Sequence, residues 1–186
     1  MPDMSHDRKK EEISDWYFTH SDAILKFILL IVRDYQQAED LTQETFVKAY
    51  KHYESFKGTS TPKTWLFSVA HNVTVDYLRR NKPIVLFKDF FGSYSVDKNP
   101  LPEDIVEIKE ESKELYDAIS NLKYSYRKII ILRKMKEFST REAGEILNWS
   151  ESKVKSTLSR AMVALEKELN KGGNSNEAIS KTAKRS

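Results

Sequence analysis

Residues 138–169 read FSTREAGEILNWSESKVKSTLSRAMVALEKEL and hold the clearest structural signal in the chain. Ser139, with Glu142 three residues later, is typical of a capping box that opens a short helix. Asn148 tolerates a left-handed turn, and Ser150 is a favoured N-cap for a second, longer helix. A short helix, a tight turn and a longer helix predict a helix-turn-helix motif.

The longer of these two helices has two chemically different faces when its residues are projected at about 100° each. One stripe is apolar and consists of Val154, Leu158, Ala161, Leu165 and Leu169. The other face is small, polar and basic and consists of Ser152, Lys153, Lys155, Ser156, Ser159 and Arg160. Small residues allow close approach to the major groove, arginine can bond a guanine edge bidentately, and lysine can hold phosphates. The pattern therefore favours DNA binding over an ordinary solvated helix.

Working outward, the N-terminal part of the chain predicts three helices. The first spans about residues 11–32 and is expected to be mostly buried, because its apolar residues recur at helical spacing. The second opens at Asp34, which has the spacing of a capping box with the glutamine three residues on. The third spans 61–80, since Thr61 can cap a helix and Pro62 suits the first helical position.

Apolar residues occur on two faces of the third helix. The face that we expect to be buried consists of Leu66, Val69, Ala70, Val73 and Tyr77. The face that we expect to point outward consists of Phe67, Ser68, His71, Asn72 and Val75. With the aromatic residues Tyr50, Tyr53 and Phe56 upstream and a polar loop before the helix, this surface is suited to stacking unpaired bases. Aromatic stripes are more often part of a core, so both interpretations stay open.

The expected fold is all-α, with two small helical domains joined by a flexible linker. The N-terminal domain covers residues 1–82, and residues 83–108 form the linker, because helical periodicity stops there. The C-terminal domain covers 109–170, with two more helices ahead of the helix-turn-helix. The tail, 171–186, has no apolar periodicity and is expected to be disordered.

Charge is unevenly distributed along the chain of 186 residues, although its net charge is only +3. Counting from the sequence, residues 1–82 hold 12 Lys and Arg against 12 Asp and Glu, and residues 83–113 hold 4 against 7. Residues 114–186 hold 15 against 9, a net charge of +6. A basic C-terminal domain suggests a nucleic-acid partner there, with a solvated surface as the alternative.

Several function classes are excluded by what the sequence lacks. It has no cysteine, its four histidines have no metal-ligand spacing, and its five glycines form no phosphate-binding loop. No cofactor, metal site or catalytic constellation is therefore expected, and the chain is not expected to be an enzyme. No signal peptide or membrane span is expected either, since the one long apolar run, 24–32, is too short. The cytoplasm is the expected location.

Three blocks together carry a resemblance to a known family. They are AEDLTQETFVKAYKHYESFKG at 38–58, TPKTWLFSVAHNVTVDYLRR at 61–80, and the helix-turn-helix block at 138–169. In this order and separation they resemble regions 2 and 4 of the extracytoplasmic-function sigma factors of the sigma-70 family. The resemblance covers about residues 13–170. It implies a subunit that binds core RNA polymerase, recognises two promoter DNA elements about three helical turns apart, and opens the downstream one.

The resemblance also implies roles for individual residues. The block that would dock on core RNA polymerase contains Asp40, Leu41, Gln43, Glu44 and Phe46. The minus-ten element would be read by Lys57, Gly58, Thr59, Ser60, Thr61, Trp65, Ser68, His71, Asn72, Arg79 and Arg80. The minus-thirty-five element would be read by Ser152, Lys153, Lys155, Ser156, Ser159 and Arg160. Gly144 and Asn148 depart from the common pattern, which has Ala and Gly at these positions.

The resemblance further implies restraint by a cognate, membrane-associated anti-sigma factor, and no homo-oligomer is expected. An alternative is a two-domain regulator that dimerises through residues 1–82 and binds a palindromic operator through its helix-turn-helix. A third hypothesis is a helical adaptor that only sequesters another protein, for which Lys155 and Arg160 would be dispensable.

Overall fold

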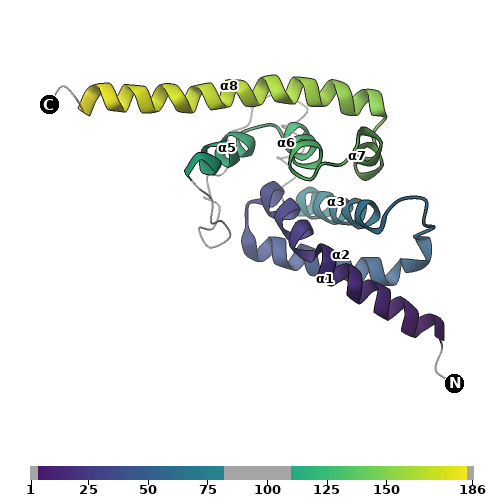
Figure 1. The fold of residues 1–186 in the computed structure, drawn as a ribbon. Helices are drawn as coiled ribbons and strands as arrows, with labels where there is room; N and C mark the ends of the chain where they lie inside the picture. Colours follow the sequence, from purple (N-terminus) through teal and green to yellow (C-terminus); the bar gives the residue numbers. More distant parts are fainter. Residues whose placement is uncertain (1–3, 82–109, 184–186) are drawn as a thin grey trace.

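The computed structural model describes residues 4–81 and 110–183, and every regular element within them is helical, as Figure 1 shows. The N-terminal module contains α1 (Met4–Val32), α2 (Tyr35–Lys51), the 3-10 turn η1 (Tyr53–Ser55) and α3 (Pro62–Asn81). The C-terminal module contains α5 (Glu110–Ser120), α6 (Tyr124–Ile130), the π-helical turn η3 (Ile131–Met135), α7 (Thr140–Leu147) and α8 (Glu151–Ala183). The all-α prediction is confirmed, while the expected linker at 83–108 lies outside the described residues.

Local signals set the helix ends in the N-terminal module. Arg33 adopts a left-handed φ of 59°, and its N–H donates to the Leu29 carbonyl at 2.8 Å, which ends α1. The Asp34 carboxylate then accepts from the Gln37 N–H at 2.9 Å and opens α2. The Thr61 hydroxyl likewise accepts from the Thr64 N–H at 3.1 Å at the start of α3. These contacts confirm the predicted starts of α2 and α3.

The hydrophobic core of the N-terminal module lies between α1, α2 and α3. Phe27 of α1 and Phe67 of α3 are fully buried, with ring centroids 5.3 Å apart. Ala38 and Ala49 of α2 are also fully buried, since small residues let α2 pack closely on its neighbours. This three-helix core holds α3 in place.

In the C-terminal module, α5, α6 and α7 pack along one side of α8, the long helix drawn in yellow-green in Figure 1. Fully buried aliphatic side chains from α6 and η3, among them Ile129 and Leu132, fill this core together with Val154 and Ala161 of α8. The module also lies against the N-terminal one, because α7 packs on α3 and α6 contacts α1. One side of α3 therefore faces α7 instead of solvent.

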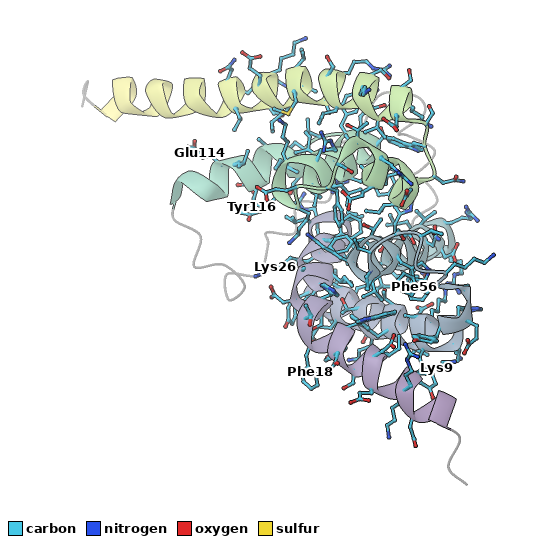
Figure 2. The ribbon with its side chains drawn as sticks, turned by 45° about the vertical axis from the view of Figure 1, so that its right-hand side comes forward. Lys9, Phe18, Lys26, Phe56, Glu114 and Tyr116 are labelled. Carbon is cyan, nitrogen blue, oxygen red and sulfur yellow. The ribbon has the colours of Figure 1, made fainter. Side chains whose placement is uncertain are left out.

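Two expectations about helix ends and burial need correction. The helix α8 does not stop near Asn170 but continues to Ala183, so the segment expected to be disordered is largely helical. Gly172 and Gly173 do not end α8; a glycine in a helix costs only about 1 kcal/mol relative to alanine. In α1, burial is concentrated after Ile24, whereas Phe18 is 80% exposed and projects away from the C-terminal module (Figure 2).

Within the described residues, no helix combines the length and the hydropathy that crossing a membrane requires. The same residues contain no group of three His, Asp or Glu side chains placed to hold a metal ion.

Candidate nucleic-acid and polymerase interfaces

The face of α8 that is expected to read DNA is fully accessible. All six of its predicted contact residues are exposed: Ser152, Lys153, Lys155, Ser156, Ser159 and Arg160. On the opposite side, Val154 and Ala161 have no exposed surface and Leu165 is buried, as the periodicity predicts, whereas Leu169 at the far end of the stripe is 38% exposed. The structure therefore presents small and basic side chains together on one open helix face.

The turn ahead of α8 orients this face. Ser139 and Glu142 form the predicted capping box at α7, with the Ser139 N–H donating to the Glu142 carboxylate at 2.8 Å. Asn148 adopts a left-handed φ of 54°, and the Ser150 hydroxyl accepts from the Lys153 N–H at 3.3 Å. The helix-turn-helix prediction is confirmed at each of these positions.

Gly144 is required by the close approach of the turn to α7. The Trp149 N–H donates to the Gly144 carbonyl at 2.9 Å. A Cβ at Gly144 would lie 2.8 Å from the Trp149 carbonyl oxygen, and a backbone atom cannot easily move aside. The departure from alanine at this position is thus explained by how tightly the backbone folds in this turn.

The loop at 57–61 begins and ends near a cluster of four aromatic rings, composed of Trp16, Tyr53, Phe56 and Trp65. Trp16 meets Phe56 edge-on at 5.1 Å, and Phe56 lies 5.4 Å from Trp65. Lys57, Gly58, Thr59 and Thr61 are exposed and Ser60 is half-buried. Gly58 has a φ of 68°, which favours glycine and lets the loop reverse.

Tyr53 and Phe56 are therefore packed against other rings instead of forming a free stacking platform. Trp16, which the sequence did not single out, is the centre of this cluster and holds α1 against the loop. Its signal was present in the sequence, since Trp16 lies three residues after the buried Ile13 on the apolar stripe of α1.

The outer face of α3 departs from expectation. Phe67 has no exposed surface and His71 is 6% exposed, although both are expected to point outward. Asn72 is exposed as expected, and so are Arg79 and Arg80 at the end of the helix; Trp65 and Ser68 are half-buried. The prediction for Phe67 and His71 is wrong because the C-terminal module covers this side of α3.

His71 lies in a cationic, poorly hydrated environment. Its Nε2 atom is 3.5 Å from the ammonium of Lys128 on α6, and an ammonium can only donate, so the imidazole accepts. Burial, followed by the charge of Lys128, lowers the pKa of His71 to about 3. The ring is therefore neutral near pH 7.

The polymerase-docking residues predicted on α2 divide into two groups. Asp40 and Gln43 are exposed, and Glu44 is half-buried with its carboxylate 3.0 Å from the Lys48 ammonium. Leu41 and Phe46 are only 3% and 6% exposed, so they support this surface from inside the core. Val47, which the sequence did not assign to the site, is 52% exposed beside Gln43 and adds an apolar contact.

Both modules match families of known proteins. The family model for sigma-70 region 2 matches residues 16–84, and the model for sigma-70 region 4 matches residues 112–165. The ECF RNA polymerase sigma factor SigM of Bacillus subtilis is 37% identical over 163 residues, covering 87% of this chain and 98% of SigM. SigX of the same organism is 33% identical over 157 residues, covering 82% of this chain and 81% of SigX.

A solved structure extends the likeness to three dimensions. The sigma factor RpoE of Bartonella quintana, crystallised with the anti-sigma factor NepR, superposes with a TM-score of 0.67 at 26% identity. The match covers 86% of this chain and 98% of RpoE. The chain belongs to the ECF RNA polymerase sigma factors of the sigma-70 family.

Proposed function

We propose that the chain directs promoter-specific transcription initiation by dividing the work among three surfaces. The observation that carries this proposal is the exposed small, polar and basic face of α8, which follows a tight turn, in a chain that also matches sigma-70 region 2 at residues 16–84. A sigma factor needs both modules in one chain, whereas an operator-binding regulator would leave the first one unexplained. The chain has no catalytic step of its own in this account.

Core RNA polymerase docks on the exposed side of α2. Asp40, Gln43 and Glu44 supply short polar side chains, and the exposed Val47 supplies apolar area beside them. Protein interfaces combine an apolar centre with a polar rim in this way. Leu41 and Phe46 contribute by fixing α2 on the core beneath.

The minus-thirty-five element is read in the duplex by α8. Arg160 bonds a base edge, and its exposure, together with the buried Ala161 that fixes the helix beside it, supports this role. Lys153 and Lys155 flank the base-reading positions and attract phosphates. Ser152, Ser156 and Ser159 are small enough to bring the helix axis close to the groove floor.

The minus-ten element is read as a single strand by the loop 57–61 and the exposed residues of α3. Contact between Phe56, before the loop, and Trp65, in the helix after it, brings the two ends of the loop together, so that unstacked bases meet a preformed polar edge. Asn72 contributes hydrogen bonds, and Arg79 and Arg80 hold phosphates of the strand. Ser68 and His71 become available on this face when it is uncovered.

A cognate anti-sigma factor, associated with the membrane, restrains the chain in the cytoplasm. The complex of the Bartonella quintana relative with its anti-sigma factor supports restraint by an anti-sigma factor. The chain itself acts as a monomer, because each of its three surfaces recognises a different target and none of them needs a second copy of the chain.

Run-off transcription with purified core RNA polymerase on genomic fragments tests the proposal. We expect discrete transcripts that depend on this chain and are lost when the double variant Asp40→Ala, Gln43→Ala is used, with its circular dichroism unchanged. A stable homodimer bound to a palindrome without polymerase would instead support the operator-binding regulator.

A further inference from the structure

We propose that the first turns of α1, through Lys9 and Glu12, position the loop 57–61 so that it can hold an unpaired base of the minus-ten element. This inference rests on the proposed function of that loop and adds positioning residues to it. Both residues precede residue 16, where the match to sigma-70 region 2 begins. The match to the family therefore does not account for the contacts that this part of α1 makes.

A short hydrogen bond joins α1 to the segment that leads into the loop. The Tyr53 hydroxyl of η1 donates to the Glu12 carboxylate at 2.6 Å, across 41 positions of the sequence. The other carboxylate oxygen of Glu12 accepts from the Arg8 guanidinium, one turn earlier in α1, at 3.0 Å. Hydrogen bonds from Tyr53 and then from Arg8 lower the pKa of Glu12, and the bond to this carboxylate raises the pKa of Tyr53. Near pH 7 the phenol therefore keeps its proton and the carboxylate its charge, which makes the bond charge-assisted and strong.

Lys9 makes a second set of contacts with this segment. Its ammonium lies 4.8 Å from the Tyr50 ring centroid, 5.8 Å from the Tyr53 ring centroid and 3.7 Å from the Glu54 carboxylate. The Lys9 side chain is only 16% exposed, whereas that of Glu54 is 82% exposed. The contacts with the two rings therefore hold Lys9 more firmly than the solvent-screened ion pair does. Figure 2 shows Lys9 on the same side of the N-terminal module as Phe56, the residue before the loop.

These contacts reach the loop through η1 and the aromatic cluster. The Phe56 N–H donates to the Tyr53 carbonyl at 2.9 Å, which closes η1 directly before the loop. The Phe56 ring then meets the ring of Trp65, in the helix after the loop, at 5.4 Å. Trp16 of α1 touches all three of these rings. Both ends of the loop are therefore tied to residues 9–16 of α1.

The loop benefits from such an anchor because its own residues are mostly exposed. Residues 57–59 are all exposed, and Gly58 adopts a φ of 68° at a position where the backbone is free to take other conformations. A loop that is already ordered loses less conformational entropy when a base binds, so positioning it in advance strengthens binding. Glu12 and Lys9 act on the loop only through η1 and the aromatic cluster, which makes them positioning residues and not DNA contacts.

Single substitutions separate the hydrogen bond from the packing around it. Tyr53→Phe removes only the hydroxyl and keeps the ring, and Glu12→Leu removes the acceptor at a similar side-chain size. Glu12→Gln keeps an oxygen that can accept from Tyr53, so it should retain part of the anchoring. The matched control is Glu11→Leu, the same change at the exposed neighbouring position. We expect all four variants to keep the helical circular dichroism of the parent protein.

Nuclear magnetic resonance relaxation of the backbone amides measures the anchoring without polymerase or promoter. For the parent protein and for Glu11→Leu, we expect order parameters of about 0.85 at residues 57–61, which is typical of a rigid backbone. In Tyr53→Phe and Glu12→Leu they should fall toward about 0.6, with Glu12→Gln between these values. Order parameters that stay unchanged in both Tyr53→Phe and Glu12→Leu would overturn the proposal.

Promoter opening by the full chain with core RNA polymerase tests the consequence for function. With Tyr53→Phe and Glu12→Leu, permanganate-reactive thymines should appear about fivefold more slowly, as expected for one lost hydrogen bond, while initial binding of the holoenzyme is unchanged. A general loss of folding would instead reduce binding and opening together. Opening at the parent rate by a variant whose loop has loosened would also overturn the proposal. If the parent protein opens no promoter, the proposed function fails, and the order parameters still decide whether α1 holds the loop.

Discussion

The two helices proposed to read DNA, α3 and α8, present their outer faces in opposite ways. Every predicted contact residue of α8 is exposed, while Phe67 and His71 of α3 lie under the C-terminal module. The chemistry differs as well, since the α8 face is small, polar and basic, whereas the covered side of α3 combines the aromatic Phe67 with the polar His71. A polar face gains nothing from being covered, whereas an apolar face loses contact with water when another module packs on it.

This contrast indicates two different kinds of recognition. The face of α8 can meet duplex DNA at any time, because closed base pairs expose their edges in the major groove. In the proposed function, the face of α3 binds bases only after they have left the DNA helix, and the C-terminal module covers the apolar Phe67 on that face. The predictions that follow test this division, beginning with the largest expected effect.

Removing the aromatic ring at the contact between the modules should have the greatest cost. Phe67→Ala is expected to lower the free energy of unfolding by about 3–5 kcal/mol, since a fully buried ring contributes to two cores. Phe18→Ala removes a phenylalanine ring from a position that is 80% exposed and should change the free energy of unfolding by less than about 0.5 kcal/mol. Urea denaturation compares them, and equal losses would contradict the burial described here.

Changing the α8 face should alter recognition and leave stability unchanged. Arg160→Ala is expected to weaken the free energy of promoter binding by about 1–3 kcal/mol. It should also reduce the preference for one base at one minus-thirty-five position, as the loss of a bidentate contact does. Lys155→Ala should weaken binding to all sequences and reduce its salt dependence. Binding of the polymerase holoenzyme to promoter duplexes, at several salt concentrations and with each upstream base replaced in turn, separates the two. A preference profile unchanged by Arg160→Ala would refute this base contact.

Acid should favour separation of the modules. When the two modules are packed together, the pKa of the buried His71 is about 3, whereas an exposed imidazole has a pKa near 6.5. Above pH 6.5 His71 is neutral whether the modules are packed or separated, so the packing of the modules has its full stability there. Below that pH His71 binds a proton only when the modules are separated, and the free energy that favours packing falls by about 2 kcal/mol by pH 5.

Proton resonances of the imidazole follow this change. Distances between nitroxide labels attached at Lys51→Cys on α2 and Glu166→Cys on α8, both exposed positions, should lengthen over the same pH range. The groups that face His71 are Lys128 of α6 and its own neighbour Asn72. His71→Gln keeps a hydrogen-bonding side chain without the titration, so its label distances should no longer respond between pH 6.5 and 5. An unchanged response in His71→Gln would assign the pH dependence to another group.

The turn before α8 should tolerate change at one position and not at the other. Gly144→Ala is expected to destabilise the C-terminal module by about 1 kcal/mol, because contact with the Trp149 carbonyl outweighs the gain in helix propensity. Asn148→Gly should be neutral or slightly stabilising, since glycine adopts the left-handed φ of 54° freely. Thermal unfolding of the two variants compares them, and a stabilising Gly144→Ala would contradict the close approach.

The sequence predicted those features that depend on neighbouring residues. Asp34, Ser139 and Asn148 each act within four residues of their own position, and all three were identified as helix caps or turns. The two stripes of α8 were also largely predictable, because Val154, Ala161 and Leu165 follow one helical period, although Met162 and Val163 lie outside it and are exposed. Interactions between residues close in the sequence were therefore enough to predict the helices, the turn and the candidate DNA-contacting residues of α8.

The covering of α3 depends on residues far apart in the chain and could not be predicted in this way. Phe67 and Phe138 are 71 positions apart in the sequence, and periodicity within α3 says nothing about its second partner. A signal did exist, since a helix with apolar residues on both faces is commonly buried on both. Leu41 and Phe46 were assigned to the polymerase-docking block from their place in the motif. The structure shows that both side chains are buried beneath the exposed side of α2.

Permanganate footprinting of promoter opening tests the division of labour most directly, because the reagent oxidises unpaired thymines. Asn72→Ala, and alanine substitutions in the loop 57–61, should leave initial binding of the polymerase holoenzyme unchanged and slow the appearance of reactive thymines. Arg160→Ala should instead weaken initial binding, with opening at the normal rate once the complex has formed. If the Asn72 and loop variants open promoters at the parent rate, the assignment of the minus-ten surface to α3 is contradicted.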